Sequence, residues 1–513
     1  MTPKTIAWLL KLLNLFVVIS AILHFIGAFN FVRKTNLGSL DLIITLLQIS
    51  FEAIFFAQIY ILIVSIINSL LNKGKLQYVT SLDEYPFIEV VIPIRSVNSL
   101  DLEKTLSGIR SANYQQDKIA IHLGDDTTNP ELVKQYKELC VRFNATHHHR
   151  IENKKYKAGM LNLILQELQT RYVVFFDYDQ IPHKNIFCTF VSLLENNPEI
   201  SYIQAKKEFR DLNTLAKVWS AGLYLLFFEI FERNKTLNDT VFFSGSTACF
   251  RRDELLQIGG FPTYSFTEDN SLTLAYLTLG KKTMYFDNIG SIGLVPPTYR
   301  LQISQLWRWS NGASTVLTNQ FMKVVKTPSL RRSQKIDIIG TLAISPVVVA
   351  LYVYCLSFVI LISRGVDAQR FSYSGISSLI LTPVMISLVY ILLITNSIYL
   401  SRKSEYSEYR YRDIPGFLII ALASNLLTIT SGLSGLFGLF SPNSKHGKWT
   451  REIRLIPMSI IFFFVGSFLI IKSIMWFIIG FESAIVVVLI GFTFLPSLLI
   501  VLYYDLKESN IVP

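Results

Sequence analysis

The chain has 513 residues, of which 51% are hydrophobic and only 17% are charged, and its mean hydropathy is +0.40. This apolar content exceeds what the core of a soluble protein of this size would bury, so the composition argues against a soluble protein and predicts an integral membrane protein. The formal net charge of +11 suits an anionic ligand and anionic lipids, but Lys and Arg also gather on the cytoplasmic side of membrane proteins in general.

Two apolar stretches open the chain, at residues 6–31 and 40–71. Each is longer than the about 20 residues that cross a bilayer as a helix. The first lacks a small-residue cleavage site and is followed at once by the second, so we interpret it as an anchor rather than a signal peptide. Residues 1–71 are therefore predicted to form two transmembrane helices.

Residues 72–335 have the composition of a soluble α/β domain and hold nearly all the acidic residues. Apolar strands separated by helices are typical of a mostly parallel sheet covered on both faces, and such sheets bind ligands at the carboxyl ends of their strands. Residues 218–231 are apolar but too short to span a membrane, which predicts a core or interfacial helix. The runs predicted as strands are residues 87–94, 119–123, 172–176, 202–205 and 241–250.

Beyond residue 335 the chain becomes apolar again, and we expect about four further transmembrane helices in residues 336–513. The charged, tyrosine-rich segment 401–413 marks a cytoplasmic loop. Residues 415–440 are long enough to cross the membrane, but both of their flanks are basic, so we favour a re-entrant or interfacial hairpin there. The predicted spans are residues 336–363, 374–400, 454–480 and 484–502, which gives six spans with both termini inside.

Asp177 and Asp179 directly follow the predicted strand 172–176. Carboxylates at i and i+2 beside a strand project to the same side. Two such oxygen ligands suit a Mg²⁺ or Mn²⁺ ion that completes its shell with phosphate oxygens and water. An Asp-x-Asp triplet alone is a weak signal because it recurs in solvated loops, but its place after a buried strand favours a metal site.

Asp125 and Asp126 close the predicted strand 119–123. One of them could accept hydrogen bonds from a nucleotide base or ribose. The alternative is an acidic turn that caps the next predicted helix, residues 130–143. The histidines at 147–149 do not indicate a metal site, because adjacent residues on a strand point to opposite faces.

Two further motifs lie on predicted helices. Thr267, Glu268 and Asp269 precede an apolar-periodic helix, so they could be its N-cap and acidic first turn, or Asp269 could be a general base for an acceptor hydroxyl. The second motif places an arginine that can neutralise a diphosphate beside an indole on which a sugar ring can stack, the alternative being a core tryptophan beside a surface arginine. Its residues share one helical face: Gln305, Arg308 and Trp309.

In this order the motifs resemble the processive membrane glycosyltransferases of glycosyltransferase family 2, the group of cellulose, hyaluronan and chitin synthases. The resemblance covers residues 87–321. It departs from the family at Ser244, where many relatives have Cys. It also departs at residues 449–451, which match the gating segment of cellulose synthases only poorly. Further matching segments are Val-Val-Ile-Pro-Ile-Arg at 90–95, Lys-Ala-Gly-Met-Leu-Asn at 157–162, Phe-Ser-Gly-Ser-Thr-Ala-Cys-Phe-Arg-Arg at 243–252 and Ile-Gly-Gly-Phe-Pro at 258–262.

The resemblance implies a cytosolic, GT-A-like α/β domain inserted into a membrane α-helical bundle. It also implies inverting transfer of a sugar from a nucleotide diphosphate sugar, a UDP-sugar by analogy with the family, with Mg²⁺ or Mn²⁺ as cofactor. The residue roles that it implies are Arg95, Asp125 and Asp126 at the nucleoside, Lys157 at a donor phosphate, Asp177 and Asp179 at the diphosphate and its metal, Asp269 as the base beside substrate-binding Glu268, and Gln305, Arg308 and Trp309 at the diphosphate and the acceptor sugar.

We therefore expect a polysaccharide synthase of the plasma membrane that extends a β-linked glycan at the cytosolic face and exports it, in contact with membrane lipids and without a nucleic acid partner. The alternative is a non-processive enzyme that glycosylates a membrane lipid. A transporter is a third hypothesis, but transport sites place ionisable residues within the spans, and these spans hold almost none beyond Glu52 and Lys472. The sequence does not determine the sugar, the acceptor or the oligomeric state.

Overall fold

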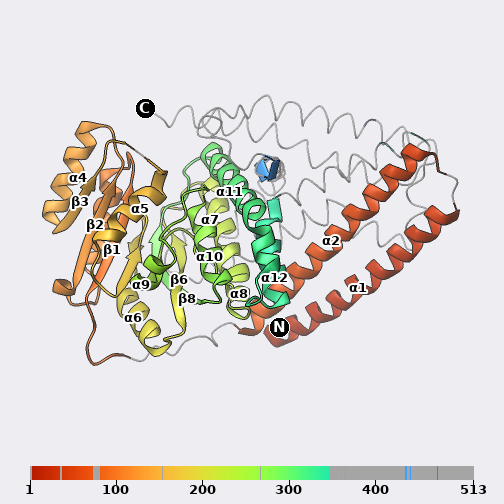
Figure 1. The fold of residues 1–513 in the computed structure, drawn as a ribbon, viewed down its shortest axis with the longest axis horizontal. Coiled ribbons are helices and arrows are strands. Elements are labelled where there is room, and N and C mark those ends of the chain that lie inside the picture. The colour runs from red at the N-terminus through yellow and green to blue at the C-terminus, as the bar shows by residue number, and fades with distance from the viewer. Residues whose placement is uncertain are drawn as a thin grey trace.

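The computed structural model describes residues 3–34, 37–72, 81–152, 154–265 and 267–345, together with residues 360, 364, 434, 435, 439, 440 and 471. Apart from residues 336–345, 360 and 471, the predicted C-terminal spans lie outside the described residues, as does most of the predicted hairpin 415–440. In the described part, an α/β domain lies at one end and two long N-terminal helices lie at the other (Figure 1).

A mixed sheet of eight strands forms the centre of the α/β domain. Strands β3, β2, β1 and β4 are parallel, β7 runs antiparallel between β4 and β6, β8 is parallel to β6, and β5 is antiparallel at the edge. The predicted α/β domain is thus confirmed, with a sheet that is parallel in its first half and mixed as a whole. In spatial order the strands are β3 (Ala145–His149), β2 (Ile119–Asp125), β1 (Ile88–Ile94), β4 (Tyr172–Phe175), β7 (Ala248–Arg251), β6 (Ile200–Phe209), β8 (Lys282–Gly293) and β5 (Ile181–Pro182).

Helices cover both faces of this sheet, as the continuous apolar strands predict. One core cluster packs α3, α4 and α6 against the sheet, and a second packs α5, α9 and α10 against the other face. The helices are α1 (Pro3–Lys34), α2 (Ser39–Asn72), α3 (Ser99–Arg110), η1 (Gln116–Lys118), α4 (Pro130–Arg142), α5 (Tyr156–Glu167), α6 (Ile186–Asn196), α7 (Leu215–Leu226), η2 (Phe227–Glu232), α8 (Arg233–Thr236), α9 (Arg252–Gln257), α10 (Glu268–Thr278), α11 (Tyr299–Lys326) and α12 (Arg332–Leu342).

One predicted strand is wrong over most of its length. Of residues 241–250, only those from Ala248 onward are in a strand, β7. Gly245 has a φ of 82° and Thr247 a φ of 56°, and such left-handed residues turn the chain out of an extended path. The apolar segment 218–231 is helical as predicted, in α7 and the π-helical turn η2.

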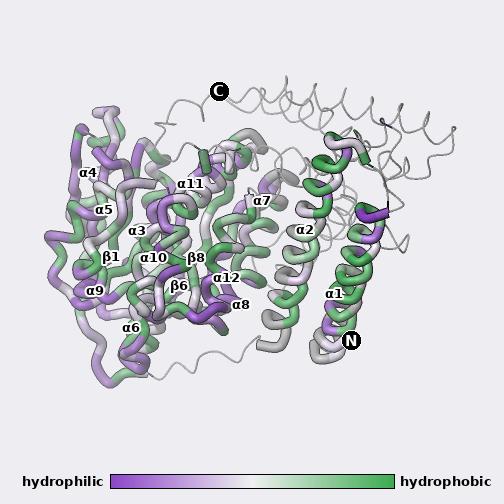
Figure 2. Tube along the Cα trace, turned by 45° about the vertical axis from the view of Figure 1, so that its right-hand side comes forward, coloured by the Kyte–Doolittle hydropathy of each residue, from purple (hydrophilic) through white to green (hydrophobic). Residues whose placement is uncertain are grey.

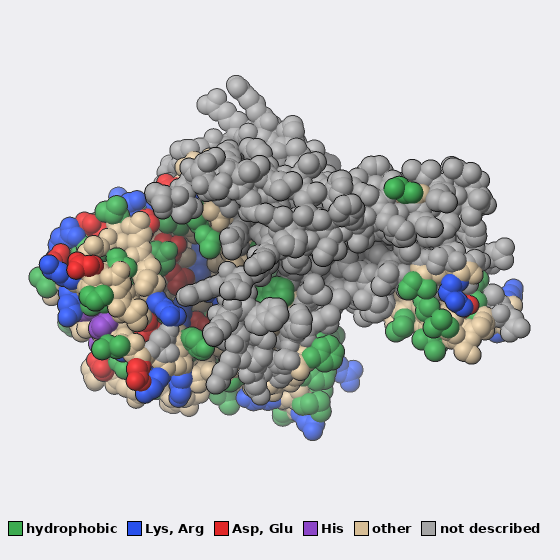
Figure 3. Space-filling view, turned by 90° about the horizontal axis from the view of Figure 1, so that it is seen from above, with side chains coloured by type: hydrophobic (Ala, Val, Ile, Leu, Met, Phe, Trp, Pro, Cys, Tyr) green, Lys and Arg blue, Asp and Glu red, His purple; other side chains and the backbone are tan. Residues whose placement is uncertain are grey.

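The helices α1 and α2 pack against each other, and α2 also contacts η2 and α8. Both are coloured largely as hydrophobic in Figure 2, whereas on the face seen in Figure 3 the charged side chains gather at the α/β end. Among the described residues, the segment Val17–Lys34 is long and apolar enough to cross a membrane, with a mean hydropathy of 1.4. The two predicted N-terminal helices are confirmed as helices, and their crossing of a membrane stays a prediction.

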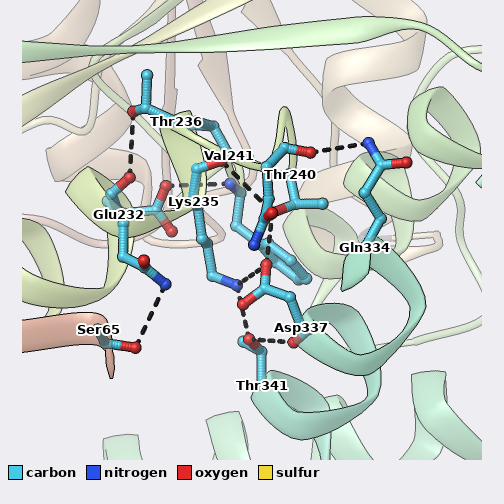
Figure 4. A network of polar contacts seen from close by, with 12 residues as sticks. Ser65, Glu232, Lys235, Thr236, Thr240, Val241, Gln334, Asp337 and Thr341 are labelled. Carbon is cyan, nitrogen blue, oxygen red and sulfur yellow. Dashed lines mark hydrogen bonds and ion pairs between the residues drawn. The ribbon is translucent and has the colours of Figure 1, made fainter. Parts of the chain in front are cut away.

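A buried polar network joins α2, α8 and α12 (Figure 4). Lys235 on α8 is only 1% exposed, and its Nζ donates to Asp337 Oδ2 at 2.9 Å and to Thr341 Oγ1 at 2.6 Å, both on α12. The adjacent Asn234 Nδ2 donates to Ser65 Oγ on α2 at 3.3 Å. Because a buried ammonium group is costly without its partner, this network fixes α12 against the α/β domain.

Candidate active site

The carboxyl ends of three parallel strands bring predicted site residues to one edge of the sheet. β1 ends at Ile94, which pairs with Asp125 at the end of β2, and exposed Arg95 follows it. β4 ends at Phe175, two residues before Asp177. Parallel topology therefore gathers these side chains at the edge where such sheets bind ligands.

The Asp125 carboxylate is fully buried and already engaged. Its Oδ1 accepts a hydrogen bond from the Thr127 N–H at 2.8 Å, and its Oδ2 lies 2.9 Å from His147 Nε2. Burial alone would raise the pKa of Asp125, but the hydrogen bonds from His147 and Thr127 hold it below its ordinary value. The alternative of a helix cap is wrong, because Asn129 caps α4 by accepting from the Glu131 N–H.

Asp126 is 5% exposed, and the Arg150 guanidinium binds its carboxylate in a bidentate manner. Arg150 Nε donates to Oδ1, and Nη2 donates to Oδ2 at 2.9 Å. The sequence analysis did not single out Arg150. In the neighbouring strand β3, His147 and His149 stack on one face with ring centroids 5.8 Å apart, while His148 contacts a histidine of β2 on the other face. The three histidines therefore do not converge on one point.

One partly buried lysine joins three of the predicted motifs. Lys157 Nζ donates to Asp177 Oδ1 at 3.0 Å and to the Gly245 carbonyl oxygen at 3.0 Å, and it lies 3.8 Å from Glu268 Oε1. A Cβ added to Gly245 would lie 3.4 Å from Asp269 Oδ2. Side chains that are far apart in the chain thus meet around a single ammonium group.

Two carboxyl groups of this cluster hold their protons more tightly than usual. Burial raises the pKa of Asp179 to about 7, and the neighbouring charge of Asp177 adds to the rise. Burial together with Glu268 raises the pKa of Asp269 to about 7. Burial would also raise the pKa of Asp177, but Lys157 holds it below its ordinary value.

The charges of the cluster fit a divalent cation. Four carboxylates interact with two ammonium groups, so these six groups carry two net negative charges when all are ionised: Asp177, Asp179, Glu268 and Asp269 against Lys157 and Lys207. The Arg210 guanidinium also acts on Asp179, but it pairs with Asp101 and Asp211. Asp179 forms no ion pair among the described residues, and its carboxylate oxygens are the donors that Mg²⁺ and Mn²⁺ prefer. Among the described residues no three His, Cys, Asp or Glu side chains are placed to hold one metal ion, so phosphate and water oxygens would have to complete the shell.

Two further residues, both on β6, hold the loop that precedes β7 and contacts Asp177. Gln204 Oε1 accepts from the Ser244 N–H, and its Nε2 donates to the Ser246 carbonyl oxygen. Lys207 Nζ donates to the Ser244 carbonyl oxygen at 3.0 Å and to Ser246 Oγ at 2.7 Å, and Ser246 Oγ in turn donates to Asp177 Oδ2 at 2.6 Å. Burial lowers the pKa of Lys207 to about 8.

Gln204 and Lys207 were not predicted from the sequence. Two consecutive lysines within a largely buried strand were the available signal. Residues three apart on a regular strand point to opposite faces, but the pairing of β6 with β8 shifts register on both sides of Lys206, where β8 contributes extra residues, and Gln204 and Lys207 both contact the same loop.

The predicted Gln-x-x-Arg-Trp motif lies on α11, so its three residues do share a helical face. Tyr224 on α7 contacts two of them: its hydroxyl donates to Gln305 Oε1 at 2.9 Å, and its ring packs edge-to-face against Trp309 at 5.4 Å. Burial raises the pKa of Tyr224, and Asp179 adds to the rise, so this tyrosine lies within electrostatic range of the acidic triplet. Arg308 is exposed. Tyr224 carried no sequence signal beyond an apolar helix.

The helix α11 also contacts a described residue of the predicted hairpin 415–440. Ser434 Oγ donates to the Trp307 carbonyl oxygen at 2.6 Å, and Asn311 Nδ2 donates to the Ser434 carbonyl oxygen at 3.2 Å. Ser434 therefore packs against the helix that carries the motif, while the hairpin itself stays a prediction.

Comparison with known proteins agrees with this arrangement of motifs. Residues 172–396 match the family Glycosyl transferase family group 2. The chain is 27% identical over 247 residues to cellulose synthase 1 of Komagataeibacter xylinus, covering 47% of this chain and 16% of that protein. It is 26% identical over 272 residues to the UDP-forming cellulose synthase catalytic subunit of Pseudomonas fluorescens, covering 51% of this chain and 36% of that protein.

Among solved structures, a mannosyltransferase from Pyrobaculum calidifontis in complex with GDP-Man and Mn²⁺ aligns with a TM-score of 0.49 and 16% identity, covering 75% of this chain and 99% of that one. The chain spans only about a sixth to a third of the length of the curated relatives quoted above. The family assignment rests on the domain match and on the cellulose synthase relatives. Residues 172–396 therefore carry a glycosyltransferase family 2 domain, and the chain is similar to cellulose synthases over about half of its length.

Proposed function

We propose that this protein is an inverting glycosyltransferase of the plasma membrane that moves a sugar from a UDP-sugar to the end of a growing β-linked polysaccharide at the cytosolic face, and that it exports the product. The alternative acceptor is a membrane lipid. The observation that carries the proposal is the shared ammonium group of Lys157, which brings Asp177, Glu268 and the Gly245 loop together beside Asp269.

The chemistry follows from where the charges lie. The acceptor hydroxyl oxygen attacks the anomeric carbon, the bond from that carbon to the diphosphate oxygen breaks, and the hydroxyl proton passes to Asp269. Attack opposite the leaving group inverts the anomeric centre. Lys157 and exposed Arg308 are the cations that would stabilise the departing diphosphate.

The supporting groups keep these parts in place. Asp177 and Asp179 would hold Mg²⁺ or Mn²⁺, and such an ion would neutralise charge on the leaving diphosphate. The Trp309 ring, fixed by Tyr224, would support the terminal sugar of the acceptor. Asp125 and Asp126 would line the nucleoside end, where Asp126 already has Arg150 as a partner.

The test incubates membranes that contain the full chain with a panel of labelled nucleotide sugars and Mg²⁺ or Mn²⁺, and then sizes the products. A polymer that grows with time from one donor supports the proposal, and label in an organic-solvent extract supports the lipid acceptor instead. If no donor yields a product that depends on Asp269, the proposed function is wrong.

A further inference from the structure

Helix α5, which carries Lys157, begins in a strained backbone turn. Lys155 has a φ of 62° and Tyr156 a φ of 54°, so two successive residues other than glycine are left-handed. Such a conformation is unfavourable for residues other than glycine and persists only where surrounding contacts hold it. The N-cap position of α5, Lys155, forms no side-chain cap.

One guanidinium group contacts two carbonyl oxygens of this turn. Arg150 Nη1 donates to the Lys154 carbonyl oxygen at 2.9 Å, and Nη2 donates to the Tyr156 carbonyl oxygen at 2.7 Å. The same guanidinium binds both carboxylate oxygens of Asp126. Its side chain is 16% exposed. The rigid fork of an arginine can satisfy all these acceptors at once, which the single ammonium of a lysine cannot do.

Gly159 shows how closely the turn is packed. A Cβ on this residue would lie 2.2 Å from the Lys154 carbonyl oxygen and 3.0 Å from Arg150 Nη1. Only a glycine at this position lets the first turn of α5 approach the Lys154 carbonyl oxygen so closely. In this closely packed conformation of the turn, Lys157 is directed at Asp177 and Gly245.

We propose that Arg150 is a positioning residue that ties the carboxylate at the nucleoside end, Asp126, to the turn that aims the phosphate-binding lysine, Lys157, so that the two ends of the donor nucleotide are bound as one unit. This inference rests on the proposed function for the identity of the ligand. The contacts themselves belong to the protein alone.

A double-mutant cycle with UDP tests the coupling. In the wild-type background, Lys157→Met should weaken UDP binding about tenfold or more, the loss expected for one charge-assisted contact. Arg150→Met alone should weaken it by a similar factor. In the Arg150→Met background, the further effect of Lys157→Met should fall to about twofold, because the lysine is no longer aimed. Calorimetric titration of the purified full chain measures all four affinities.

Hydrogen exchange tests, without any ligand, whether the contacts of Arg150 stabilise the turn. Peptides that cover residues 154–162 should exchange about tenfold faster in Arg150→Met, and to an intermediate degree in Arg150→Lys, which keeps the charge but not the fork. The matched control is Arg142→Met, which removes an arginine whose side chain is 56% exposed and pairs with Glu103, and it should change neither exchange nor UDP binding.

The outcomes separate this inference from the proposed function. Additive losses in the cycle, or unchanged exchange over 154–162 in Arg150→Met, overturn the positioning role. If Arg150→Met does not fold, the binding cycle and the hydrogen exchange are measured on Arg150→Lys instead. Wild-type results in both measurements then overturn the positioning role. If the wild-type chain binds no UDP, the proposed function fails. Faster exchange over residues 154–162 in Arg150→Met would still support the role of Arg150 in holding the turn.

Discussion

Replacing Asp269 by Asn separates the catalytic role of a buried carboxylate from its structural cost. Asn keeps the size of the side chain but cannot take a proton from the acceptor hydroxyl. Because general-base catalysis contributes about 10²- to 10⁴-fold, turnover should fall by that factor. The same change removes a charge that the folded protein holds at a cost, so the variant should be inactive and more stable.

The size of the stability gain follows from the pKa of Asp269, which burial raises from 3.8 to about 7. Each pKa unit corresponds to ~1.4 kcal/mol, and since Asp269 is only partly buried we expect a gain of on the order of 2 to 4 kcal/mol at pH 8. Between pH 3.8 and about 7, unfolding releases the proton that the folded state holds, so the stability of the wild type falls as the pH rises through this window. Above about pH 7 the carboxyl is ionised in both states, and its contribution becomes constant.

The assay is thermal unfolding of the detergent-purified chain in EDTA at pH 5, 6, 7 and 8. The unfolding midpoint of Asp269→Asn should exceed that of the wild type by several degrees at pH 8, and by much less at pH 5. Asp253→Asn is the matched control, because the Asp253 side chain is 75% exposed and pairs with Arg252. Its unfolding midpoint should follow that of the wild type at every pH.

Two results would refute the reasoning. Wild-type turnover in Asp269→Asn would exclude this residue as the base. A difference in unfolding midpoint that is the same at pH 5 and pH 8 would show that burial does not raise the pKa of Asp269.

Three further predictions concern the surroundings of the base. Gly245→Ala should destabilise the protein by ~1 kcal/mol, because the φ of Gly245 is 82°. The same change should raise the KM for the acceptor, because the added methyl group would lie 3.4 Å from Asp269 Oδ2. The free energy of unfolding and the KM of the variant are each compared with those of the wild type. Tyr224→Phe should lower kcat/KM by roughly two- to tenfold through the lost hydrogen bond to Gln305, whereas an unchanged value would exclude that contact from function. Asp337→Ala should lower stability by about 3 kcal/mol in a denaturation experiment, because it leaves a buried ammonium group unpaired.

The sequence predicted the elements whose signals are local. Buried parallel strands appear as continuous apolar runs, so β1, β2 and β4 lie where residues 87–94, 119–123 and 172–176 predict them. Strand 241–250 was placed wrongly because the left-handed residues in it do not interrupt the apolar pattern. Helical spacing likewise placed the Gln-x-x-Arg-Trp motif on one face of α11.

Other features depend on contacts between distant parts of the chain. Lys207 reaches the site where the pairing of β6 with β8 is irregular, although its place in the alternating pattern of the strand would point it to the other face. Tyr224 becomes part of the site only because α7 packs beside α11. Arg150 gains its role from a turn whose strain has no signature in residue type.

By itself, therefore, the sequence determined which chemical groups the protein has, in which order, and at the ends of which strands, because backbone periodicity and side-chain chemistry are local properties. Only the tertiary structure decided which of these groups share a lysine or an arginine. Those pairings depend on distances of about 3 Å between residues far apart in the chain, and such distances are set by the packing of the whole domain.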